Sequence, residues 1–123
     1  MQILENRAAV VTGGGRGIGR GHCLALAQVG AHVVVNDIDR DAAEEVAGEI
    51  RAAGGKSVAS TDNIGTRSGA EALIERCKAE FGAIDCLVNN AGNLKDRSFL
   101  KMTDEEFDVV WTVHVKGTFW CTQ

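Results

Sequence analysis

The sequence lacks the features that would direct a protein to nucleic acid or into a membrane. Its formal net charge is −4 and its 13 lysines and arginines are scattered, whereas neutralising phosphates requires a basic face. Its longest apolar runs, such as residues 8–11 and 33–35, are strand-sized, far below the roughly 20 residues that a membrane-spanning helix needs. No basic start followed by a long apolar stretch opens the chain, so no secretory signal is expected. We therefore expect a cytoplasmic protein with neither a nucleic-acid nor a membrane partner.

The cysteines also lack the spacing that a metal site or a redox motif requires. Cys23, Cys77, Cys86 and Cys121 contain no C-x-x-C pair, and the three histidines do not cluster with them in the sequence. Clustered ligands are what a zinc site needs, so no metal is expected. Because all four cysteines fall inside expected helices or strands, the pattern predicts buried, reduced thiols.

What is present is an alternation of strand and helix patterns over all 123 residues, enough for one domain with a core. The strands are short apolar runs, and the helices carry apolar residues at every third or fourth position. Two helix starts carry capping-box patterns, Ser68-x-x-Glu71 and Thr103-x-x-Glu106. We expect strands at residues 7–12, 31–36, 57–61 and 84–88, and helices over 17–29, 43–53, 68–81 and 103–123.

Strands that alternate with helices of about a dozen residues indicate βαβ units. The predicted fold class is therefore α/β, a Rossmann-like doubly wound parallel sheet with helices on both faces. Right-handed crossovers and glycine at the first turn favour the strand order 3-2-1-4. We expect residues 1–123 to form one dinucleotide-binding domain that is truncated before the later strands of such a sheet.

The strongest motif lies at residues 12–19, TGGGRGIG, where the first strand turns into the first helix. Glycines let the backbone turn sharply and approach a pyrophosphate, and the helix start offers unpaired N–H groups to it. A P-loop requires Lys and then Ser or Thr after its last glycine, but Arg20 and Gly21 follow here. The G-x-G-x-x-G spacing is also absent. The turn therefore predicts dinucleotide binding, with a purely structural turn as the alternative.

Two aspartates follow the next strands. Asp37 ends the second strand, 18 residues after Gly19, where a dinucleotide-binding fold places an acid on the adenosine ribose. Its carboxylate would repel a 2′-phosphate, whereas Arg16 in the glycine turn would attract one. We give Asp37 the greater weight and expect NAD rather than NADP. Asp62 follows the third strand and can accept from the adenine amino group, although a solvated turn aspartate is the alternative.

A pair of asparagines follows the fourth strand, in the run Asn89-Asn90-Ala91-Gly92. Ligands of open α/β sheets bind along the carboxyl edge, where this run is expected to lie. An ordinary turn is the alternative interpretation.

In this order and spacing, Thr12-x6-Gly19, the two aspartates and the asparagine run resemble the short-chain dehydrogenase/reductase family over essentially the whole chain. The resemblance implies that Asp37 contacts the ribose and that Asp62 and Asn63 flank the adenine. It places Asn90, Ala91 and Gly92 near the adenosine ribose, with Asn89 bracing the central strands. It assigns the pyrophosphate region to Gly13, Arg16, Gly17, Ile18 and Gly19.

The sequence departs from the family at its catalytic positions. Family members carry an asparagine in the fourth helix, then a serine and a Tyr-x-x-x-Lys, whose tyrosine gives or takes the proton. Here His114 stands at the asparagine position, and the 123 residues contain no tyrosine. His114 is thus the one candidate catalytic residue, with a helix-face histidine as the alternative. We expect residues 1–123 alone to be inactive, either as a fragment of a longer enzyme, which we favour, or as a binding module.

The resemblance implies an oxidoreductase that moves hydride between a nicotinamide and a small-molecule secondary alcohol or ketone. Residues 94–99 and 113–117 resemble hydroxyacyl thioester dehydrogenases and oxoacyl reductases. A non-catalytic dinucleotide-sensing module and a methyltransferase-like nucleotide fold are the alternatives. We expect a homo-oligomer. The fourth strand should form an open edge, and Phe107, Trp111 and Phe119 should be exposed beside it.

Overall fold

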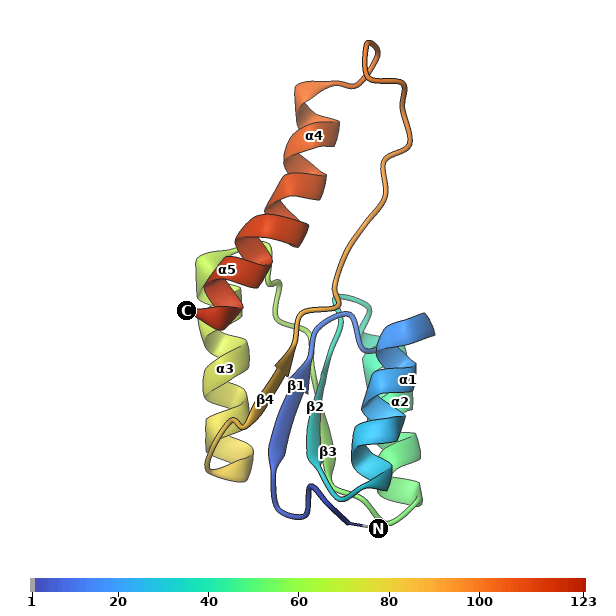
Figure 1. Ribbon diagram of the computed structural model, residues 1–123, viewed down its shortest axis with the longest axis vertical. Coiled ribbons are helices and arrows are strands. Elements are labelled where there is room, and N and C mark those ends of the chain that lie inside the picture. Colours follow the sequence, from blue (N-terminus) through green and yellow to red (C-terminus); the bar gives the residue numbers. More distant parts are fainter. Residues whose placement is uncertain (1) are drawn as a thin grey trace.

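Four short parallel strands form the centre of the molecule, in a computed structural model that describes residues 2–123 (Figure 1). The order across the sheet is β3-β2-β1-β4, which confirms the predicted topology. One continuous row of the register runs through Val58, Val34, Val10 and Leu87. The strands are β1 (Ala8–Val11), β2 (His32–Asn36), β3 (Ser57–Ser60) and β4 (Cys86–Val88).

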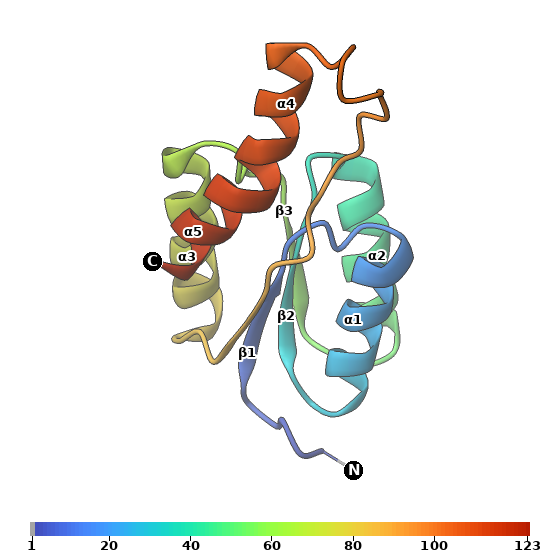
Figure 2. The ribbon, with the colours of Figure 1, turned by 45° about the horizontal axis from the view of Figure 1, so that its top comes forward.

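Helices cover both faces of the sheet, as Figures 1 and 2 show from two directions. One face packs against α1 (Gly17–Gln28) and α2 (Arg40–Ala52). The other packs against α3 (Arg67–Phe81) and the last helix, α5 (Gly117–Thr122). Alternate side chains of one strand therefore enter different cores, which explains why the strands are apolar without a polar alternation.

The first strand shows this division directly. Ala9 and Val11 belong to the core beneath α1 and α2, whereas Ala8 and Val10 belong to the core beneath α3 and α5. All four are almost completely buried. Because β1 pairs with both β2 and β4, the turn that follows it starts from a strand that is hydrogen-bonded on both sides.

The N-cap of the third helix lies two residues earlier than its sequence pattern predicted. Thr66, in extended conformation, is the N-cap, and its side chain accepts a hydrogen bond of 3.0 Å from the Gly69 amide. The expected capping box of Ser68 and Glu71 is therefore wrong, because Thr66 already satisfies the first free amide. The predicted end is confirmed, since Gly82 takes the left-handed conformation with φ 82°.

The last predicted helix, over residues 103–123, is divided into three segments. Its capping box is confirmed, because Thr103 and Glu106 bond to each other's backbone at the start of α4 (Asp104–Trp111). A π-helical turn, η1 (Thr112–Lys116), then separates α4 from α5. The Thr118 hydroxyl, at the start of α5, donates to the carbonyl of His114 in η1 at 2.7 Å, a contact that competes with regular helical bonding. The sequence pattern did not reveal this widened turn.

The sheet has an open side along β4, whose three residues are only half-buried. Figure 1 shows α4 and the connection before it extending away from the sheet. Phe107, Trp111 and Phe119 are 53%, 46% and 54% exposed, as expected from the sequence. Cys23, Cys77 and Cys121 are buried and Cys86 is half-buried, and none of these four is paired. Within residues 2–123, no helix has the length and hydrophobicity to cross a membrane, and no metal-binding cluster of side chains occurs.

Candidate functional site

The glycine turn and the asparagine run are joined to each other at the carboxyl edge of the sheet. The Thr12 hydroxyl is buried and accepts hydrogen bonds of 3.0 Å from the amides of Asn90 and Ala91. In return, the Asn90 side chain donates to the carbonyls of Thr12 and Gly13 at 3.1 and 3.0 Å. Two motifs that lie 77 residues apart thus form one continuous surface at the ends of β1 and β4.

Two glycines of the turn leave no room for a side chain. A Cβ on Gly13, whose φ is 62°, would lie 2.8 Å from the Ala91 Cα. A Cβ on Gly19 would lie 2.0 Å from the Gly13 carbonyl oxygen and 2.5 Å from the Asn90 amide nitrogen. The close approach between the start of α1 and the asparagine run therefore requires glycine at both positions.

The start of α1 is left without a side-chain cap. Arg16 occupies the N-cap position in extended conformation, makes no capping hydrogen bond, and is followed by no acidic residue in the first turn. Nothing lies within 4 Å of a Cβ built on Gly17, and Ile18 is 76% exposed. The free amides and positive dipole end of a 12-residue helix thus face open space, an arrangement suited to an anion.

Asp37 is fixed beside the glycine turn by two backbone amides. Its Oδ2 accepts from the Gly15 amide at 3.0 Å, and its Oδ1 accepts from the Asp39 amide at 3.0 Å. The side chain is half-buried, so each oxygen keeps an acceptor site for a further donor. The carboxylate thus lies at the end of β2 next to the turn, as the sequence predicted.

The two residues predicted to flank the adenine separate in the structure. Asn63 lines the cleft described below, and its Oδ1 accepts from the Gly65 amide at 2.8 Å. Asp62 lies outside the cleft wall, because the Ser60 hydroxyl holds its carboxylate at 2.8 Å and Asn36 donates to its carbonyl at 2.9 Å. Asp62 therefore joins the ends of β2 and β3, and Asn63 is the residue presented to the cleft.

These residues surround a cleft of about 490 Å³ at the carboxyl edge. Its wall includes seven of the residues singled out from the sequence: Gly13, Arg16, Asp37, Asn63, Asn90, Ala91 and Gly92. It also includes six that sequence reasoning missed: Asn36, Ile38, Asp39, Ile64, Asn93 and Val113. No sequence signal marked Ile38, which is 77% exposed, because single exposed apolar residues are common on protein surfaces.

His114 lies behind the cleft and holds the loop that forms part of its wall. Its Nε2 lies 3.1 Å from the Asn93 amide and 3.0 Å from the Asn93 carbonyl oxygen. A Cβ on Gly92 would lie 2.5 Å from the His114 ring. The structure therefore places His114 against the backbone of Gly92 and Asn93, where it can position the loop.

Asn89 makes a different contact from the one expected. Its side-chain amide donates to the Thr122 hydroxyl at 3.2 Å, which joins the end of β4 to α5. The bracing of neighbouring strands is supplied instead by Asn90, through the carbonyls that follow β1.

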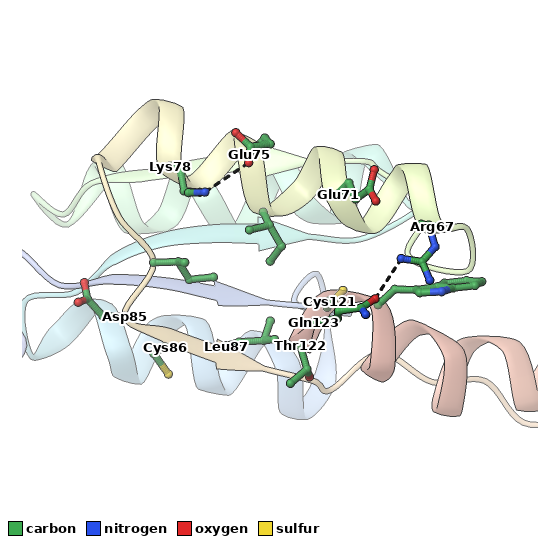
Figure 3. Close-up of a pocket in the computed structure, with 13 residues that line it drawn as sticks. Arg67, Glu71, Glu75, Lys78, Asp85, Cys86, Leu87, Cys121, Thr122 and Gln123 are labelled. Atoms are coloured by element: carbon green, nitrogen blue, oxygen red, sulfur yellow. Dashed lines mark hydrogen bonds and ion pairs between the residues drawn. The ribbon is translucent and has the colours of Figure 1, made fainter.

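A larger hollow, of about 670 Å³, lies elsewhere, along the outer side of β4 between α3 and the end of α5 (Figure 3). Arg67 and Gln123 close one end of it with a bond of 3.0 Å, and Lys78 pairs with Glu75 at 3.4 Å along α3. None of the residues predicted to bind a ligand lines it. Size therefore does not identify the site, whereas the convergence of free amides and fixed polar groups at the carboxyl edge does.

Comparisons with known proteins identify the family of the chain. The sequence profile described as short chain dehydrogenase matches residues 7–123. The chain is 42% identical over 128 residues to the peroxisomal multifunctional enzyme type 2 of Mus musculus, covering 97% of this chain and 17% of that protein. It is 41% identical over 119 residues to the 3-oxoacyl-(acyl-carrier-protein) reductase FabG of Staphylococcus epidermidis, covering 96% of this chain and 49% of that protein.

A solved structure gives the same result for the fold. The crystal structure of a short chain dehydrogenase from Mycobacterium avium superposes with a TM-score of 0.94 at 45% identity. That match covers 97% of this chain and 44% of the other. The chain thus spans less than half the length of each of these three proteins.

Proposed function

Because the chain belongs to the short-chain dehydrogenase family, we propose that residues 1–123 are the cofactor-binding part of an oxidoreductase. Its nicotinamide cofactor is NAD in preference to NADP, and its substrate is a small molecule with a secondary alcohol or a ketone. The observation that carries this proposal is the junction of the glycine turn with Asn90 and Ala91, which surrounds the uncapped start of α1.

The start of α1 suits the pyrophosphate of such a cofactor. Free amides in the first turn donate to phosphate oxygens, and the helix dipole favours an anion there by about 0.3–1 kcal/mol. The open space at Gly17 leaves room for the phosphates, and Ile18 is exposed beside them. The residues proposed to hold the pyrophosphate are Gly13, Arg16, Gly17, Ile18 and Gly19.

The cleft suits the adenosine half. The acceptor sites left on the Asp37 carboxylate can take the ribose hydroxyls, and the same negative charge opposes a 2′-phosphate. Ile38 and Ile64 supply apolar wall for a planar base, and Asn63 supplies polar groups at its edge. Ala91 and Gly92 lie on the opposite side of the cleft from β2, along the ribose.

The cofactor supplies the hydride when it is bound, and this part of the protein orients it. Residues 1–123 contain no tyrosine, so the tyrosine that transfers the proton in the family is not supplied by them. We assign His114 the role of positioning Gly92 and Asn93, because its ring contacts their backbone. The relatives are named as enzymes, which favours an oxidoreductase over a non-catalytic sensing module.

For the substrate we favour a 3-hydroxyacyl or 3-oxoacyl thioester. The segments 94–99 and 113–117 resemble enzymes of that kind, and one relative is named as a 3-oxoacyl-(acyl-carrier-protein) reductase. To test this assignment, kcat/KM of the full-length protein is measured for a 3-oxoacyl thioester and for a simple ketone. A higher kcat/KM for the simple ketone would contradict it.

Titration of the full-length protein with NADH tests the cofactor site. In Gly19→Ala, the added methyl would overlap the Gly13 carbonyl, so we expect NADH affinity to fall at least about a hundredfold. Gly21→Ala is the matched control on the same helix, because nothing lies within 4 Å of a Cβ at that position. Equal NADH affinity in the two variants, or tighter binding of S-adenosylmethionine than of NADH, would contradict the proposal.

A further inference from the structure

One charged residue in the wall of the cleft was not singled out by the sequence motifs. We propose that Asp39 is a specificity-determining residue, because it holds the Arg16 guanidinium in an ion pair and so withholds it from the 2′-phosphate of NADP. This inference deepens the proposed function and depends on it. Among the residues that line the cleft, Arg16 is the one cation and Asp39 is its partner.

Asp39 is anchored by further hydrogen bonds, whereas Arg16 is the more exposed member of the pair. Its Oδ1 accepts from the Ala42 amide at 3.2 Å as the N-cap of α2, and its own amide donates to Asp37. Its Oδ2 accepts from Arg16. The Arg16 side chain is 69% exposed, whereas that of Asp39 is 45% exposed. The position of the Arg16 guanidinium is therefore set by its bond to Asp39.

The charge of Asp39 persists at neutral pH. The hydrogen bond from the Ala42 amide lowers the pKa of this carboxyl most strongly. Burial opposes it, and the bond and charge of Arg16 lower the pKa further, so that it lies below its ordinary value. A charged Asp39 acts twice on a 2′-phosphate. It neutralises the cation, and it adds a second negative charge beside Asp37.

The consequence distinguishes this inference from control by Asp37 alone. A guanidinium freed from Asp39 presents donors in the fork geometry that suits phosphate. Removal of the Asp39 charge should therefore strengthen binding of ligands that carry a 2′-phosphate, through Arg16. An exposed ion pair contributes less than about 1 kcal/mol, so the size of the effect depends on the loss of repulsion from Asp39 together with the new bond between Arg16 and the phosphate.

The test compares two pairs of ligands that differ by one 2′-phosphate: NADPH with NADH, and adenosine 2′,5′-bisphosphate with adenosine 5′-monophosphate. The second pair measures the adenosine site without the nicotinamide. Asp39→Asn in the full-length protein removes the charge and keeps a good helix N-cap. We expect the affinity ratio of phosphorylated to unphosphorylated ligand to rise about fivefold to tenfold in both pairs.

Two further variants separate a specific effect from a change in net charge. Glu49→Gln removes the same charge from α2 and frees Arg20, which pairs with Glu49 at 2.8 Å outside the cleft wall. It should change the ratio less than about twofold. In Arg16→Gln, the additional change Asp39→Asn should raise the ratio much less, because no cation is left to be released.

A ratio that stays at its original value in Asp39→Asn, while NADH still binds, would overturn the inference and leave the proposed function intact. The inference would also be overturned if the full rise in the ratio persisted without Arg16. Failure of the unaltered protein to bind NADH would refute the proposed function and this inference with it.

Discussion

Replacement of Asn90 by alanine should damage the fold and the cofactor site together, because this side chain joins the two motifs. Its amide donates to the carbonyls of Thr12 and Gly13 at 3.1 and 3.0 Å. Each such bond contributes about 0.5–1.5 kcal/mol. Asn90→Ala loses both, which predicts a decrease in the free energy of unfolding of about 1–3 kcal/mol. The two bonds that the Thr12 hydroxyl accepts from backbone amides remain.

Asn89→Ala is the matched control, because it is the same change one residue away. Asn89 is exposed and makes one hydrogen bond of 3.2 Å, to Thr122. The expected decrease in the free energy of unfolding is therefore at most about 0.5–1 kcal/mol. Urea denaturation of the full-length variants measures both stabilities, and NADH titration measures the site. Equal destabilisation by the two changes, or undiminished NADH affinity in Asn90→Ala, would refute the reasoning that Asn90 holds the glycine turn in place.

Three further predictions concern the core, the thiols and the edge of the sheet. Leu73→Ala should lower the free energy of unfolding, measured by urea denaturation, by about 2–5 kcal/mol, whereas Leu100→Ala should lower it by under about 0.5 kcal/mol. The reason is that Leu73 is 0% exposed and Leu100 is 93% exposed. Similar decreases at both positions would contradict the assigned core. Burial raises the pKa of the Cys23 thiol to about 12. In the folded protein at pH 8, alkylation should therefore label Cys86 before Cys23, as read by peptide mapping. The reverse order would show that α1 opens. Residues 1–123 expressed alone should associate, because β4 presents an open edge and Phe107, Trp111 and Phe119 are exposed. They should show no turnover of NADH with ketones, because they contain no tyrosine to transfer the proton. A dilute, stable monomer in sedimentation, or turnover free of contaminating enzyme, would contradict this.

The sequence was sufficient for the order of the strands and for the main chemical groups at their ends. Apolar runs locate β1 to β4 and the spacing of glycines locates the turn, because both signals are local. Asp37 was predicted correctly beside the turn for the same reason, since it directly follows a buried strand. The exposure of Phe107 and Trp111 also followed from an apolar stripe with no partner in the chain.

What sequence reasoning missed depends on contacts between distant residues. The pair of Arg16 and Asp39 joins residues that lie 23 apart, and nothing in the spacing shows which carboxylate the arginine selects. The contact of His114 with Asn93 likewise joins residues 21 apart, and the widened turn η1, which contains this histidine, is not visible in the spacing of apolar residues. Thr66 displaced Ser68 as the helix cap because two acceptable caps lay close together, and only the backbone conformation distinguishes them.

Hydrogen exchange with and without saturating NADH, read by mass spectrometry on the full-length protein, tests the location of the cofactor most directly. Bound NADH should slow exchange of the amides at residues 13–19, 37–39 and 90–93, which surround the cleft and the free start of α1. Residues 67–78, along the larger hollow shown in Figure 3, should exchange as before. Protection along α3 and β4 with none at the glycine turn would place the cofactor elsewhere and contradict the assignment of the carboxyl edge.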